Sequence, residues 1–173
     1  MRSGDRSDPV AALIRAATHA DAAAIGAIYD HYVRETVVTF EETEVGANAM
    51  ATRVADVQSR GLPWLVVECD GHLAGYAYAG PWKARSAYRH TVESTIYLAP
   101  GHTGRGLGLP LYRALVDALR ACGTHAVIGG ISLPNAASIA LHERAGFRPI
   151  GRFAEVGRKF DRWIDVGYWQ LLL

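Results

Sequence analysis

Residues 91–108 read TVESTIYLAPGHTGRGLG, and this stretch decides the fold. Its first eight residues alternate between two faces, as a β-strand does, so that Glu93, Thr95 and Tyr97 share one face. Leucines then recur every four residues and predict one apolar face of a helix: Leu107, Leu111, Leu115 and Leu119. The stretch therefore predicts a strand, a glycine turn and a helix in succession.

Further elements follow on both sides of this unit. Short apolar or alternating runs predict strands over residues 13–16, 64–78 (interrupted by a hairpin turn at Asp70-Gly71), 126–131, 148–153 and 162–172. Helical spacing predicts helices over residues 22–32, 46–60 and 135–145. Residues 35–40 fit either a loop or an edge strand, and residues 83–90 fit a loop. Hairpins come first and strand–helix units later, which predicts an α/β (α+β) fold with a mixed sheet and helices on both faces.

Composition narrows the class of protein. A chain of 173 residues, half hydrophobic and one-fifth charged, predicts a single folded domain over residues 10–173 behind a flexible tail at residues 1–9. A net charge of +1 argues against a dedicated nucleic-acid binder. Two cysteines argue against a disulfide framework and favour the cytoplasm. The seven histidines follow no metal-binding spacing, so no metal is expected. No apolar run approaches a membrane span.

The glycine turn at residues 101–108 suits an anion. Glycines let the backbone approach a ligand, and a helix start offers unpaired N–H groups to a phosphate. The turn lacks the Gly-Lys-Ser/Thr triplet of a P-loop, and Leu109 stands where a dinucleotide fingerprint needs its third glycine. A phosphate site and a plain strand–helix turn with a glycine cap both remain compatible with these residues.

The same turn resembles the acyl-CoA pyrophosphate loop of the GCN5-related N-acetyltransferases. Gly106 and Gly108 stand at the end of the family pattern, whereas Thr103 stands where the family has Arg or Gln. The resemblance runs from about residue 14 to residue 171. Within that superfamily the chain more closely resembles the phosphinothricin and methionine sulfoximine N-acetyltransferases, through segments 78–85, 92–95, 133–135 and 165–171. This likeness implies a mixed, mostly antiparallel sheet, acetyl-CoA as cosubstrate, and a homodimer with active sites near the subunit contact.

The resemblance also implies which residues hold acetyl-CoA. The expected pyrophosphate contacts are Thr103, Gly104, Arg105, Gly106, Leu107 and Gly108. The pantetheine arm is expected to pair with the backbone of Ile96 and Leu98, as an added strand would. Asn135 is expected to hold the arm from the next strand–helix turn, although a role as the N-cap of its helix competes with this one.

Two residues are candidates for the chemistry. Acetyl transfer to an amine requires a neutral nucleophile, so a base helps at neutral pH. The resemblance implies that Glu93 is this base; the structural alternative is a solvent-facing Glu or one paired with Arg89. His142 stands where many members have a Tyr that protonates the departing thiolate. His142 could donate a proton, hold a bridging water, or serve only in packing.

The acceptor is expected to be a small amino-acid-like molecule. The resemblance places substrate contacts at Phe40, Lys83, Arg85, Tyr88 and Thr95. Lysine and arginine at this spacing could clamp an anionic group, although surface loops carry the same residues. Another amine acceptor, such as a protein N-terminus, or a non-catalytic acyl-CoA-binding module are the alternatives.

Overall fold

A computed structural model describes residues 12–173, so the predicted tail at residues 1–9 lies outside the described residues. Seven strands form one sheet in the order β1-β2-β3-β4-β5-β7-β6. The strands are β1 (Ala12–Ala16), β2 (Trp64–Cys69), β3 (His72–Pro81), β4 (Thr91–Leu98), β5 (Ala126–Leu133), β6 (Arg148–Lys159) and β7 (Arg162–Leu172). Only β4 and β5 are parallel neighbours, and the other five pairs are antiparallel. The predicted mixed, mostly antiparallel sheet is confirmed.

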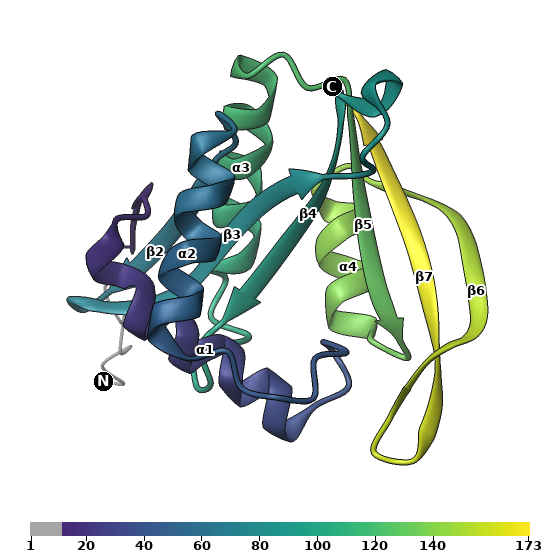
Figure 1. The fold of residues 1–173 in the computed structure, drawn as a ribbon, viewed down its shortest axis with the longest axis horizontal. Helices are drawn as coiled ribbons and strands as arrows, with labels where there is room; N and C mark the ends of the chain where they lie inside the picture. The colour runs from purple at the N-terminus through teal and green to yellow at the C-terminus, as the bar shows by residue number, and fades with distance from the viewer. Residues whose placement is uncertain (1–11) are drawn as a thin grey trace, which may run out of the picture.

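Helices cover both faces of this sheet, as predicted (Figure 1). The helices are α1 (Ala22–Glu35), α2 (Gly46–Ser59), α3 (Gly108–Ala121) and α4 (Ala136–Arg144). Two apolar cores result, because consecutive strand residues point to opposite faces. Val66 packs in the core with α1 and α2, whereas Val67 packs in the core with α3. None of the helices within residues 12–173 is long and apolar enough to cross a membrane.

Local sequence explains where several elements begin and end. Asp70 and Gly71 have φ angles of +54° and +76°, so the predicted hairpin turn between β2 and β3 is confirmed. The side chain of Asn135 accepts a hydrogen bond from the Ser138 N–H at 3.1 Å and caps α4. Thr18 and Asp21 hydrogen-bond to each other ahead of α1.

One open alternative is resolved and two predicted strand ends need correction. Residues 36–40 form no strand, so the loop interpretation of this segment holds. Strand β3 continues past the predicted end at Tyr78, through Gly80 to Pro81. Its pairing with β2 ends at Tyr78, so the N–H group that Pro81 lacks would have had no partner strand there. Strand β6 runs six residues beyond Phe153, across a register shift at which Glu155 has a φ of +50°.

The parallel pair separates along its length. Strands β4 and β5 are paired only from Thr91–Ala126 to Ser94–Gly129. Beyond this point β5 stays paired with β7 as far as Leu133. Figure 1 shows β4 and β5 together near the C-terminus of the chain and diverging toward their arrowheads. The second half of β4 therefore has one unpaired edge.

Candidate active site

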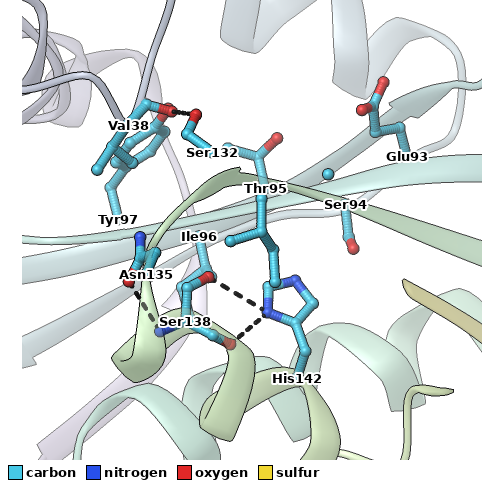
Figure 2. A pocket seen from close by; sticks show the side chains of 12 residues that line it. Val38, Glu93, Ser94, Thr95, Ile96, Tyr97, Ser132, Asn135, Ser138 and His142 are labelled. Atoms are coloured by element: carbon cyan, nitrogen blue, oxygen red, sulfur yellow. Dashed lines mark hydrogen bonds between the residues drawn. The ribbon is translucent and has the colours of Figure 1, made fainter. Parts of the chain in front are cut away.

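A cavity of about 90 Å³ opens where β4 and β5 diverge (Figure 2). Strand β4, strand β5, helix α4 and the loop after α1 all contribute to its wall. The lining residues are Val38, Glu93, Ser94, Thr95, Ile96, Tyr97, Gly130, Ile131, Ser132, Asn135, Ser138 and His142. The structure thus brings together five predicted site residues: Glu93, Thr95, Ile96, Asn135 and His142.

Glu93 lies in this wall as an unpaired, half-buried carboxylate. Burial raises the pKa of Glu93, and no residue among 12–173 offsets this with a hydrogen bond or an ion pair. The alternative pairing with Arg89 is not seen; the guanidinium of Arg89 donates to the Ser86 carbonyl at 3.3 Å. A carboxylate with a raised pKa and no partner is suited to accept a proton.

His142 is buried, with an exposed fraction of 4%. Its Nδ1 lies 2.8 Å from the Ser138 carbonyl oxygen, and because a carbonyl only accepts, Nδ1 carries the hydrogen. Burial lowers the pKa of His142, which favours the neutral ring. In that tautomer Nε2 has a free lone pair and accepts rather than donates.

Glu93 and His142 approach β5 from opposite faces of the sheet. A Cβ on Gly129 would lie 2.6 Å from Cδ2 and Nε2 of His142, and a Cβ on Gly130 would lie 3.3 Å from Oε1 of Glu93. Figure 2 shows Glu93 pointing away from the side on which Ser94 and His142 lie. The two glycines therefore leave room for both side chains, and each side chain meets the cavity from its own face.

A buried hydroxyl pair supports the base of the cavity. The hydroxyls of Ser94 and Tyr112 lie 2.7 Å apart, and Ser94 also donates to the Ile128 carbonyl at 3.3 Å. Tyr112 therefore donates to Ser94, because the single Ser94 proton is used. The ring of Tyr112 in turn packs edge-on against His142, with ring centroids 5.0 Å apart.

The free edge of β4 presents backbone groups to the gap. The N–H of Ala99 bonds to Ala74 on β3, so by alternation Ile96 and Leu98 direct their backbone groups away from β3. The Tyr32 hydroxyl donates to the Leu98 carbonyl at 2.7 Å. The Leu98 carbonyl is thus already bonded, whereas the backbone groups of Ile96 have no strand partner on this edge.

The glycine turn leaves a row of backbone donors unused. Among the described residues, none accepts a hydrogen bond from the N–H groups of residues 103–108, although the adjacent His102 N–H bonds to Ala99. Gly104 and Gly106 have φ angles of +74° and +79°, which other residues rarely adopt. The side chain of Leu107 is buried in the core, so only its backbone faces the turn. Free amides at a helix start fit a pyrophosphate.

The remaining predicted substrate residues lie elsewhere. Lys83, Arg85 and Tyr88 line a second cavity of about 290 Å³, which shares no lining residue with the first. Phe40 is 38% exposed and packs against Gly157 of β6. Within one chain, the three loop residues are therefore not gathered around Glu93.

Sequence reasoning missed several residues of the site. The pair Gly129–Gly130 carried a usable signal, because two glycines inside an apolar strand often mark a close approach of another group. No sequence signal marked Val38, Ser132 or Tyr32, since each contributes through a contact with a residue distant in sequence. Within residues 12–173 no three His, Cys, Asp or Glu side chains gather as a metal site.

Comparison with known proteins identifies the family. The profile described as an acetyltransferase (GNAT) domain matches residues 14–167. The chain therefore belongs to the GNAT acetyltransferase family.

Three curated relatives are similar to this chain over most of its length. The chain is 43% identical to a phosphinothricin N-acetyltransferase of Streptomyces viridochromogenes, over 91% of this chain and 85% of the relative. It is 41% identical to the L-amino acid N-acyltransferase MnaT of Escherichia coli, over 92% and 93% of the two chains. It is also 41% identical to an L-methionine sulfoximine/L-methionine sulfone acetyltransferase of Salmonella typhimurium, over 92% and 94%.

Solved structures share the fold. A GNAT superfamily phosphinothricin acetyltransferase from Sinorhizobium meliloti, in complex with acetyl-CoA, has a TM-score of 0.91 and 37% identity, covering 94% of this chain and 88% of that one. A Salmonella typhimurium structure with its cofactor acetyl-CoA has a TM-score of 0.92 and 40% identity, covering 94% of both chains.

Proposed function

We propose that this protein transfers an acetyl group from acetyl-CoA to the amino group of a small amino-acid-like molecule such as phosphinothricin, methionine sulfoximine or methionine sulfone. One observation carries the proposal: the unpaired Glu93 carboxylate lines a cavity at the free edge of β4, and that strand leads into the unused amides of residues 103–108. The acetyl-CoA complexes of the structural neighbours and the names of the relatives support it.

The residues of this chain fit acetyl-CoA along one path. The backbone donors of residues 103–108 would hold its pyrophosphate, with Arg105 adding a charge-assisted contact. The unpaired backbone of Ile96 would hydrogen-bond the pantetheine arm, together with the N–H of Leu98. The oxygen of Asn135 is used by the helix cap, so its amide NH₂ group is the part available to the arm.

Glu93 would act as the general base. An amino acid's ammonium group must lose a proton before its nitrogen can attack the thioester. A carboxylate oxygen of Glu93, near the free edge of β4, can take that proton directly or through water. The raised pKa of Glu93 makes the carboxylate a better base than an exposed glutamate would be.

His142 would act as a hydrogen-bond acceptor. Its Nδ1–H is engaged by Ser138, so the free Nε2 can hold a water molecule or another donor in the cavity. The neutral ring has no second proton for a departing thiolate. Among the roles left open by the sequence, the geometry favours the water-holding one.

The proposal includes a homodimer. Lys83, Arg85 and Tyr88 line a separate cavity of their own chain, so a substrate contact from them requires a second copy to carry this loop to the Glu93 cavity. Light scattering would measure the dimer. The next test mixes equal amounts of Glu93→Gln and Arg85→Ala chains. Random exchange makes about half of the dimers mixed, and one of the two sites in each mixed dimer is intact. The mixture should therefore recover about a quarter of wild-type activity. No recovery after confirmed exchange of chains would refute the contribution across subunits.

The central test follows CoA release with the three named acceptors. Wild-type protein should turn over at least one of them. Glu93→Gln should lower kcat by about 10²–10⁴-fold and leave acetyl-CoA binding nearly unchanged, because it removes a base and keeps the shape. Glu155→Gln, at an exposed position of β6, serves as the matched control. Absence of turnover with all three acceptors would overturn the proposed substrate class.

A further inference from the structure

Residues 36–45, which we name the roof loop, connect α1 to α2 and close one side of the cavity. Val38 lines the cavity, and its carbonyl accepts a hydrogen bond from the Ser132 hydroxyl at 3.4 Å (Figure 2). In Figure 1 this connection passes below the diverging arrowheads of β4 and β5. The position of the roof loop therefore determines the shape of that end of the cavity.

The helices hold one side of the roof loop. The hydroxyl of Tyr29 lies 2.7 Å from Thr39 Oγ1, and the carboxylate of Glu41 accepts two hydrogen bonds from Arg53 at 2.6 and 3.0 Å. These contacts involve α1 and α2, which the loop itself connects. These contacts do not explain what holds the other side of the roof loop, next to β5 and β6.

Lys159, the last residue of β6, supplies that second anchor. It is 2% exposed, and its Nζ donates to the Thr39 carbonyl at 2.9 Å. No carboxylate among residues 12–173 lies within 4.0 Å of this ammonium group, although Glu41 and Glu42 are near enough to favour its charged form. Burying an ammonium group without an ion pair is costly. The hydrogen bond to Thr39 and the Phe160 ring, whose centroid lies 5.2 Å from Nζ, offset part of that cost.

Gly157 supplies a second, independent contact two residues earlier on the same strand. A Cβ at Gly157 would lie 2.3–2.8 Å from three atoms of the Phe40 ring. Only a residue without a side chain lets the ring rest on the strand here. Strand β6 thus holds two consecutive residues of the roof loop, Thr39 through a hydrogen bond and Phe40 through packing.

We propose that Lys159 is a positioning residue for the acceptor site: by holding the Thr39 carbonyl, it keeps the adjacent Val38 where it lines the cavity. The inference rests on the proposed function. It assigns acceptor recognition partly to the end of β6, whose side chains do not line the cavity. The binding of acetyl-CoA, which uses β4 and the glycine turn, is independent of this contact.

The test compares Lys159→Met with wild type, using methionine sulfoximine as the acceptor. Methionine fills similar space but cannot donate the hydrogen bond. We expect the KM for the acceptor to rise about tenfold, the range of a hydrogen bond from a charged donor, and the KM for acetyl-CoA to change less than about twofold. Hydrogen exchange of the amides of residues 36–45 should become faster. Arg158→Met, at the exposed neighbouring position, should alter neither quantity.

Gly157→Ala provides a second variant if Lys159→Met does not fold. It should raise the acceptor KM in the same selective way, because the new methyl group displaces Phe40 and with it the roof loop that carries Val38. Equal rises in both KM values, or unchanged exchange in the roof loop, would overturn the inference while leaving the proposed function intact. If wild type has no turnover with any acceptor, the proposed function and the acceptor role of Lys159 fall together. Exchange would then still decide whether Lys159 holds the loop.

Discussion

Gly129→Ala offers a direct test of how His142 is packed. A Cβ on Gly129 would lie 2.6 Å from Cδ2 and Nε2 of His142, whereas carbon contacts are favourable only near 3.5 Å or beyond. The ring would have to move by roughly 0.9 Å. It is held by the 2.8 Å bond to Ser138 and by the rings of Tyr112 and Phe147, whose centroids lie 5.0 and 5.3 Å away.

Such overpacking costs about 1–3 kcal/mol in unfolding free energy. Loss of the Nδ1 hydrogen bond adds about 1 kcal/mol. For a chain of this size each kcal/mol lowers the Tm by about 2–4 °C, so a total of about 2–4 kcal/mol should lower the midpoint by roughly 4 to 16 °C.

Thermal and urea unfolding, followed by circular dichroism, would measure the change. Gly151→Ala is the control, because a methyl group added there would have no atom within 4 Å and the φ of Gly151 is not positive. That variant should stay within about 0.5 kcal/mol of wild type. If Gly129→Ala were as stable as Gly151→Ala, His142 would not pack against β5 as described, and its assignment to the cavity would fail.

Three further predictions follow from individual groups. The acidic limb of the pH profile of kcat/KM should lie above the ordinary glutamate pKa of 4.5, since burial raises the pKa of Glu93, and Glu93→Gln should abolish that limb. The hydrogen bond from Arg15 lowers the pKa of Asp21, so this pair stabilises the fold above the ordinary pKa of 3.8, and its contribution disappears as the pH falls below that value. In urea unfolding across this range, Asp21→Asn should therefore lose less unfolding free energy on acidification than wild type. Tyr112→Phe should cost about 1 kcal/mol by urea unfolding, because Ser94 loses its donor, whereas Tyr88→Phe at an exposed site should cost less; equal effects would contradict the buried pair.

Sequence periodicity was sufficient to predict most of the helices and strands. The alternation over residues 91–98 and the leucine spacing after Gly106 depend only on near neighbours in the chain, and both elements are present. Asp70-Gly71 likewise specified its own turn, because positive φ at two positions is a local property. The family, and with it the candidate base at Glu93, also followed from residues that lie close together in sequence.

The arrangement of the site residues could not be predicted from local sequence patterns alone. The loop carrying Lys83 and Arg85 is adjacent to β4 in sequence, yet the sheet order directs it to a cavity separate from that of Glu93. The roles of Gly129 and Gly130 depend on which helix and strand side chains pass over them.

What the sequence by itself determined were the secondary-structure elements, the glycine turn and the family, since each rests on propensities and short motifs read along the chain. What only the tertiary structure decided were the divergence of β4 from β5, the orientation of Glu93 and His142 to opposite faces, and the bond from Lys159 to Thr39 across 120 positions. The physical reason is that these features arise from contacts between distant segments, whose proximity is set by strand order and by packing of the two cores rather than by the residues' own preferences.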